Sequence, residues 1–293
     1  DTSVSIAVNK DNPELKNQID SFLDTLSDKE KREMMDEAIE RIPATITSLS
    51  DNIFIAAKQI FEVYSPLFIS GIGSTLTLAF SGTILGLLIG LIIGAIRAIK
   101  VEERDSLISK IVKRVVWFIT TVYIEIFRGT PMMVQGAFIY YGLKNIVHWS
   151  PFTAGVFVIT INTGAYMAEI IRSGIQAVDK GQSEAARSIG MNSVQTMLYI
   201  VLPQAIKNSF PAIGNEFVIN IKDSSVLNVI AVTELFYQAK SVAGSLYAFV
   251  PTYFVVALIY LCLTFPTTRI LNYIEKRMNR KKAIVFDQEG SVQ

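Results

Sequence analysis

The chain has 293 residues, of which 51% are apolar and 18% charged, and its mean hydropathy is +0.39. This composition excludes an ordinary soluble globular domain. The net charge of +1 says little, because the charges are segregated and none occurs in residues 63–96 or 241–268. Uncharged apolar runs longer than about 18 residues are typical of membrane-spanning helices. The sequence therefore predicts a multi-pass protein of the plasma or inner membrane.

Few residues are available for catalysis or for binding a cofactor. The single His148 and the single Cys262 provide almost no material for a His/Cys metal site or a nucleophilic triad. No Gly-x-x-x-x-Gly-Lys-Ser/Thr phosphate loop occurs, so ATP hydrolysis by this chain is not expected. The basic clusters flank the apolar runs and indicate membrane orientation, not nucleic-acid binding. We expect no catalytic residue, no metal and no bound cofactor.

Residues 1–50 differ from the rest and predict a small α/β soluble head. The first apolar residues alternate with polar ones, as in a half-buried strand: Val4, Ile6 and Val8. Asn12-Pro13 opens a predicted helix, and Ser27 with Glu30 forms a capping box for a second one. Such a small unit is marginal by itself. It is either a piece of a larger domain or an amphipathic linker.

The apolar runs predict five membrane spans, at residues 67–96, 115–143, 149–171, 207–221 and 247–270. We expect the second span to be kinked or broken at Pro131, because proline interrupts the helical hydrogen-bond ladder. In the first span, Gly86, Gly90 and Gly94 recur every four residues on one face. This spacing lets another helix approach closely.

Basic residues orient the spans. One group follows the first span: Arg97, Lys100, Arg104, Lys110, Lys113 and Arg114. A second group begins at the end of the fifth: Arg269, Lys276, Arg277, Arg280, Lys281 and Lys282. The positive-inside rule places both groups in the cytoplasm, so the head lies outside. The uncharged run 188–206 is therefore interpreted as a helix merging into the fourth span, since a sixth span would move the basic tail outside.

The predicted fold class is an all-α polytopic membrane protein with five spans, N-out and C-in, plus the α/β head. Its parts are an extracellular head at 1–50 and an amphipathic connection at 51–66. A transmembrane domain at 67–277 and a cytoplasmic tail at 278–293 complete the chain.

A charged helix, a glycine and a second helix occupy residues 181–203, on the predicted cytoplasmic side. Ser183 is expected to cap the first helix and Glu184 to lie in its first turn. The small side chains of Ala185 and Ala186 leave room for a partner surface. Gly190 is expected to end this helix with a positive φ. Asn192 or Ser193 would cap the second helix, and Leu202-Pro203 marks a bend in it. Such a rigid helix could transmit the motion of a soluble partner to the spans. A plain capped cytoplasmic loop is the alternative.

Four motifs, in order, resemble those of the polar amino-acid uptake permeases of type I ABC importers, which include the histidine and glutamine permeases. They are Glu125-Ile-Phe-Arg-Gly-Thr-Pro131, Gly164-Ala-Tyr-Met-Ala-Glu169 with Arg172, Glu184-Ala-Ala to Pro203, and Lys222-Asp-Ser-Ser225. The resemblance covers about Ser70 to Arg277, and Ser224 stands where threonine is more usual. The head resembles the C-terminal end of an amino-acid-binding domain fused ahead of the permease.

This resemblance implies several partners. They are a cytoplasmic ABC ATPase dimer, which would supply ATP and Mg²⁺, a second permease subunit, identical or different, and an extracellular substrate-binding domain, besides membrane lipid. The loop at 181–203 would then couple the permease to the ATPase.

Polar residues inside spans are costly in lipid and usually face a cavity or a partner. Asn162, Tyr166 and Glu169 share one helical face and, with Thr163, are candidates for the substrate path. Hydrogen bonding to a neighbouring helix is an equal alternative. The uncharged Asn162 favours a neutral polar substrate such as glutamine.

Further polar positions are candidates for structural or gate roles. Glu125 and Arg128 lie three residues apart and are expected to neutralise each other. Asp223, Ser224 and Ser225 lie where the fourth span leaves the membrane, and they would contact the binding domain, close an outer gate or cap a helix.

Two other functions compete with the permease. A membrane enzyme would use Glu125 or Glu169 as an intramembrane acid. An ion-driven secondary transporter would need inverted repeats, which the five spans do not display.

Overall fold

The computed structural model describes residues 17–18, 21–22, 25–27, 29–30, 49–99, 101, 103 and 105–289, without the side chains beyond 278. The chain divides into two compact units, Asp1–Asp51 and Asn52–Gln293. In the first unit the predicted capping box is confirmed. The Ser27 backbone N–H donates to Glu30 Oε2 at 2.8 Å, and the Glu30 N–H donates to Ser27 Oγ at 3.3 Å. The predicted strand around Val4 to Val8 and the Asn12-Pro13 helix start lie outside the described residues.

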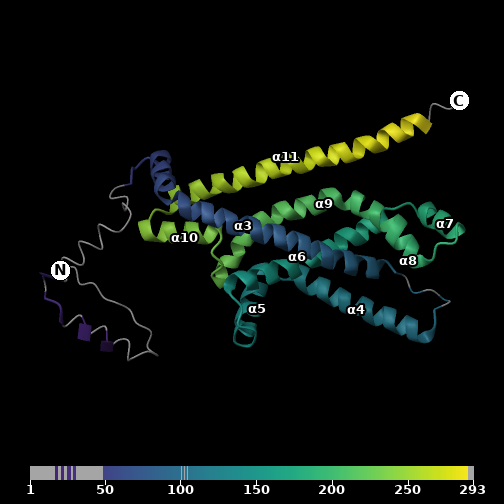
Figure 1. Cartoon of the computed structure of the whole chain (residues 1–293), viewed down its shortest axis with the longest axis horizontal. Helices are drawn as coiled ribbons and strands as arrows, with labels where there is room; N and C mark the ends of the chain where they lie inside the picture. Colours follow the sequence, from purple (N-terminus) through teal and green to yellow (C-terminus); the bar gives the residue numbers. More distant parts are fainter. Residues whose placement is uncertain are drawn as a thin grey trace. The chain divides into compact units, whose positions relative to one another are not determined.

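In its described residues the second unit contains helices joined by short loops, and no strands (Figure 1). Its elements are α3 (Ile53–Ala98), α4 (Leu107–Gly129), α5 (Met132–Val147), α6 (Pro151–Gln176), α7 (Lys180–Ser188), α8 (Ser193–Gln195), a π-helical segment η1 (Thr196–Val201), α9 (Leu202–Asp223), a 3₁₀ segment η2 (Ser224–Ile230), α10 (Leu235–Leu246) and α11 (Phe249–Glu289). Three helices are long and apolar enough to cross a membrane: Ile53–Ala98, Pro151–Gln176 and Phe249–Met278.

Several helix boundaries differ from the expectation. α3 begins at Ile53 and contains Pro66, so residues 53–66 are helical and continuous with the predicted first span. α4 begins at Leu107, capped by Ser106, and the predicted loop residues 110–114 therefore lie within the helix. α11 continues to Glu289, into the predicted tail. The predicted break is confirmed, because α4 ends at Gly129 and α5 begins at Met132.

The core of the second unit is the contact between α3 and α6, where glycines of α3 let the two backbones approach. A Cβ added at Gly86 would lie 2.8 Å from the Thr163 side chain, and one at Gly94 would lie 2.9 Å from the Ala168 carbonyl oxygen. Gly90 lies in the same way directly against Met167. The predicted close approach at the glycine face is confirmed, and its partner is α6.

A short hydrogen-bond chain joins α3, α6 and α9 in this core. Thr163 Oγ1 donates to Asn220 Oδ1 at 3.0 Å, and Asn220 Nδ2 donates to Thr83 Oγ1 at 2.9 Å. All three side chains are buried. Hydrogen bonding satisfies polar groups that would otherwise be costly in this environment.

α10 is held against α3 and α11 through its first turn. The buried Glu234 accepts from the N–H groups of Phe236 and Tyr237 at 2.9 and 2.7 Å, and from Tyr260 of α11 at 3.2 Å. The next N–H, at Leu235, donates to Thr75 Oγ1 of α3 at 3.2 Å. These contacts satisfy the free N–H groups at the start of the helix.

Within the second unit, α7 and the C-terminal part of α11 lie toward one end, whereas α10 lies toward the other (Figure 1). The predicted coupling helix and the basic tail thus share one end of the unit.

Candidate functional site

The break between α4 and α5 is stabilised by two side-chain amides. Gln135 Nε2 donates to the Phe127 and Thr130 carbonyl oxygens at 3.0 and 2.9 Å. Asn162 Nδ2, from α6, donates to Phe127 O at 3.1 Å and to Gln135 Oε1 at 2.9 Å. The last carbonyls of a helix lack intrahelical donors, and Pro131 brings no N–H of its own. The two amides therefore provide the missing donors.

This break opens onto an outer cavity of about 480 Å³ between α4, α5, α6 and α9. Its charged lining residues are Arg128 from α4 and Glu216 and Asp223 from α9. Asn162 and Tyr166 complete the wall on α6. Among the described residues, no ion pair joins Arg128 to either carboxylate. These charges thus face the cavity without neutralising one another by direct contact.

A second, inner cavity of about 430 Å³ adjoins the outer one, because both are lined by Arg128 and Tyr166. The Arg128 guanidinium lies over the Tyr166 ring, with Cζ 5.4 Å from the ring centroid. Farther along α6, the inner cavity is lined by Glu169 and Arg172. The two cavities form a polar route along one face of α6.

The structure sorts the predicted path residues into two groups. Asn162, Tyr166 and Glu169 line the cavities, as their common helical face predicts. Thr163 does not, because its side chain is buried against Asn220 and Thr83. Both Thr163 and Asn162 make the hydrogen bonds to neighbouring helices that the alternative describes, and Asn162 also lines the outer cavity.

The expected ion pair between Glu125 and Arg128 is wrong. Glu125 is exposed and makes no ion pair among the described residues, while Arg128 turns toward Tyr166. Glu125 and Arg128 both lie in the last turns of α4, but only Arg128 lines the cavity that α4 and α5 form with α6 and α9. The cation–π contact and the cavity therefore take the place of the predicted i,i+3 pair.

The three residues at the end of α9 have different surroundings. Asp223, the last residue of α9, lines the outer cavity. The Ser224 side chain is fully buried and donates to the Ile221 carbonyl oxygen at 2.9 Å. The Ser225 carbonyl oxygen accepts from Asn228 Nδ2 at 2.7 Å inside η2. Of these three residues, only Asp223 lines the outer cavity.

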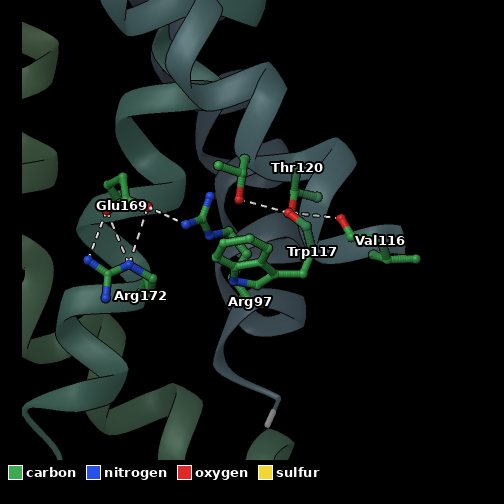
Figure 2. Close-up of polar contacts among 7 residues, drawn as sticks. Arg97, Val116, Trp117, Thr120, Glu169 and Arg172 are labelled. Carbon is green, nitrogen blue, oxygen red and sulfur yellow. Dashed lines mark hydrogen bonds and ion pairs between the residues drawn. The ribbon is translucent and has the colours of Figure 1, made fainter. Parts of the chain in front are cut away.

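Glu169 lies in a charged cluster at the inner cavity. Arg172 donates to both of its carboxylate oxygens, with the shortest distance 2.8 Å from Nη2 to Oε2. Arg97, from the last turn of α3, approaches Glu169 Oε1 at 3.7 Å. Figure 2 shows both guanidinium groups next to the carboxylate, Arg172 at its two oxygens and Arg97 on the side of Trp117 of α4.

The predicted coupling helix is present as α7, but its cap differs. Asp179 caps it by accepting from the Gly181 N–H at 2.7 Å, so Ser183 lies inside the helix and Glu184 in its second turn. The expectation for Ser183 as cap is wrong because the helix begins at Lys180, before the glycine. Glu184 and Ala185 are exposed, whereas Ala186 is buried within the chain and not free for a partner.

The rest of the loop follows the prediction. Gly190 has φ +88° and ends the helix, a conformation that favours glycine. Asn192 caps α8 in a capping box with Gln195. The chain then runs without a gap through η1 into α9, as expected for the uncharged run. The π-helical segment lies just before Pro203, where the Leu202 N–H bonds to the Met197 carbonyl.

Three residues of the site escaped the sequence analysis. Gln135 and Asn220 stood as polar residues inside apolar stretches, which is a usable signal. Arg97 was interpreted only as an orientation charge. Its contact with Glu169 depends on how α3 and α6 pack, and local spacing carries no information about that.

With this geometry established, the comparisons identify the family. Residues 106–280 match the family described as binding-protein-dependent transport system inner membrane component. The chain belongs to this family. The glutamine transport system permease protein GlnP of Escherichia coli (strain K12) is 36% identical over 216 residues, 73% of this chain and 93% of that protein. The probable glutamine ABC transporter permease protein GlnM of Bacillus subtilis is 45% identical over 161 residues, 55% of this chain and 74% of that protein.

Solved structures of ABC transporters are also similar to this chain. An amino acid ABC transporter crystallised with histidines is similar with a TM-score of 0.65 and 39% identity, over 78% of this chain and 100% of that one. The MetNI methionine ABC transporter, in an inward-facing conformation, shares the fold, with a TM-score of 0.60 at 19% identity over 72% of this chain and 96% of that one.

Family membership decides the broad function. The chain is an inner-membrane permease subunit of an ABC transporter, a transport subunit and not an enzyme. Permeases of this family work with a separate ATPase, a second permease and a binding protein. The comparisons support this function and not the ion-driven transporter or the membrane enzyme.

Proposed function

We propose that this permease imports a polar amino acid, such as glutamine, along the two cavities beside α6. The names of the relatives, which refer to glutamine, support the substrate class. The arrangement of charge in the outer cavity carries the proposal. An amino acid is a zwitterion, and this cavity has a cation on one wall and carboxylates on another.

Arg128 is the group suited to the substrate carboxylate. A guanidinium binds carboxylates with two parallel hydrogen bonds. Beside it, α5 begins directly after Pro131, and the first N–H groups of a helix have no intrahelical acceptor. A helix start within a membrane protein attracts the anionic group of a substrate. Arg128 and the start of α5 therefore form the anionic-group end of the proposed site.

Glu216 and Asp223 suit the substrate ammonium group. Both belong to α9, and Glu216 is 7% exposed and makes no ion pair among the described residues. An unpaired carboxylate inside a membrane protein is costly unless a cation or a water-filled path faces it. Asn162 and Tyr166 would then face the substrate side chain. Neither of these two residues is charged, which favours a neutral polar side chain at that wall.

The partners and topology of the complex are part of the proposal. We propose five spans with the head outside, where residues 1–50 would be the end of a fused binding domain or a linker to it. A second permease, identical or different, would complete the path. α7 would dock on a cytoplasmic ATPase dimer carrying ATP and Mg²⁺, through the exposed Glu184 and Ala185. The basic residues around α7 and α11 support the cytoplasmic side.

Substrate-stimulated ATP hydrolysis in proteoliposomes tests the transport proposal. The full chain is reconstituted with its ATPase and binding-protein partners and assayed with a panel of amino acids. We expect stimulation by glutamine, and a loss of about tenfold or more in stimulated activity with Arg128→Gln, because the charge-assisted hydrogen bonds to the substrate carboxylate are removed. Glu125→Gln, three residues away and outside the cavity, is the matched control. Equal activity of both variants would contradict the role of Arg128.

The coupling role of α7 has a separate test. Glu184→Lys reverses the exposed charge of this helix and is expected to release the ATPase during purification. Lys180→Glu, at the first residue of the same helix, is the charge-reversed control. If the ATPase stayed bound to the Glu184→Lys permease and its hydrolysis still responded to substrate, the proposed docking through α7 would be wrong. The proposal for the substrate path does not depend on this result.

A further inference from the structure

Three charged side chains meet where α3, α4 and α6 converge beside the inner cavity (Figure 2). Glu169 is bound by Arg172 through hydrogen bonds of 2.8 to 3.2 Å. Arg97 lies next to the same carboxylate, 3.7 Å from Oε1. Two guanidinium groups thus share one carboxylate, and the cluster retains a net positive charge.

The two arginines differ in their freedom to move. Arg172 lines the inner cavity, and 29% of its side chain is exposed. Only 12% of the Arg97 side chain is exposed, and its guanidinium lies 5.7 Å from the centroid of the Trp117 ring. Arg97 Nε and Nη1 are buried without a hydrogen-bond partner in the described part of the chain. Such a group is costly to bury, and its attraction to Glu169 offsets part of that cost.

We infer that Arg97 is a specificity-determining residue, which keeps Glu169 from attracting cationic amino acids into the path. This inference rests on the proposed function. Arg97 is not among the residues that line either cavity, so it acts through Glu169 and does not touch the substrate. It is a positioning residue.

The physical reason is the balance of charge on the cavity wall. An uncompensated carboxylate in a poorly hydrated path attracts the second positive charge of lysine or arginine. Arg172 already neutralises Glu169 through short hydrogen bonds to both carboxylate oxygens, so Arg97 gives the cluster its net positive charge. Arg97 stays in place behind the wall. With both arginines present, the cluster is net positive and repels the second positive charge of a lysine or arginine substrate, whereas Glu169 with Arg172 alone would not.

Direct binding of amino acids tests this inference. The complex of the full chain with its ATPase is purified without any separate binding protein, so that selection by that protein does not contribute. Isothermal titration with glutamine, lysine and glutamate gives the affinity ratios. Arg97→Gln is expected to raise the affinity for lysine relative to glutamine by about tenfold, because the cluster then loses its net positive charge.

Two matched variants separate charge from packing. Arg97→Lys keeps the positive charge and is expected to keep the wild-type ratio of lysine to glutamine affinity. The double variant Arg97→Gln/Glu169→Gln restores a net positive charge, now carried by Arg172, and is expected to return the ratio toward the wild-type value. A packing defect alone would not be repaired by the second substitution.

Glu169→Gln by itself provides an independent measurement, even where Arg97→Gln fails to assemble. It leaves both guanidinium groups unpaired and is expected to raise the relative affinity for glutamate. An unchanged lysine ratio in an assembled Arg97→Gln complex, or an unchanged glutamate ratio in Glu169→Gln, overturns the inference. If the wild-type complex bound none of the three amino acids, the proposed function itself would fail.

Discussion

The two faces of α6 show how one helix serves packing and transport. One face contacts the glycines of α3 through Thr163 and Met167, with no space for another methyl group. The other face, with Tyr166 and Glu169, lines two cavities. Both faces contain polar side chains. What separates them is the partner helix, because small residues on α3 allow contact whereas the broken α4–α5 pair leaves space.

The largest expected effect comes from filling the packed face. Gly90→Leu places a side chain against Met167 and is expected to separate α3 from α6. Overpacking costs about 1–3 kcal/mol and occasionally more, which lowers the thermal transition of a domain of this size by roughly 2–12 °C. Thermal unfolding in detergent measures it. Gly73→Leu, where nothing lies within 4 Å of an added Cβ, is the control and is expected to unfold like the wild type.

The second prediction concerns the break between α4 and α5, which leaves the space beside the cavity face of α6. Gln135→Leu removes the donor to the Phe127 and Thr130 carbonyls, so we expect a loss of about 1–3 kcal/mol and reduced transport. Unfolding and amino-acid uptake are measured together. Gln176→Leu, at the exposed end of α6, is the matched substitution. A wild-type melting curve for Gln135→Leu would show that these hydrogen bonds do not hold the break.

A smaller effect is expected on the cavity face. Tyr166→Leu removes the ring beneath Arg128, a contact worth about 0.5–2 kcal/mol. We expect a few-fold loss of apparent affinity for glutamine with an unchanged unfolding transition. Uptake kinetics measure the first and thermal unfolding the second. Tyr273→Leu, on an exposed part of α11, controls for loss of a tyrosine. A stability defect without an affinity change would assign Tyr166 to packing.

The smallest effect is expected for Thr163→Val. The substitution keeps the shape of the side chain and removes one hydrogen bond to Asn220, while Asn220 retains its bond to Thr83. We expect a destabilisation of about 1 kcal/mol and no change in amino-acid selectivity. Competition for glutamine uptake by other amino acids checks the second point. A changed competition profile would indicate that Thr163 contributes to the substrate path after all.

Much of the membrane part could be predicted from local sequence. The helix break at Pro131, the turn at Gly190 and the cap at Asn192 follow from residue chemistry that acts over a few positions. The cap of α7 was missed, since Asp179 and Ser183 are both good cap residues and local preference does not choose between them.

The sequence by itself determined which residues avoid lipid, where helices end and which side of α6 is polar, because hydropathy and helical periodicity are local properties. Only the tertiary structure decided that Thr163 is buried, that Arg128 faces Tyr166 instead of Glu125, and that Arg97 reaches Glu169. These outcomes depend on which helices meet. A charge costs or gains free energy according to its nearest partner in space, and packing brings that partner from a distant part of the chain.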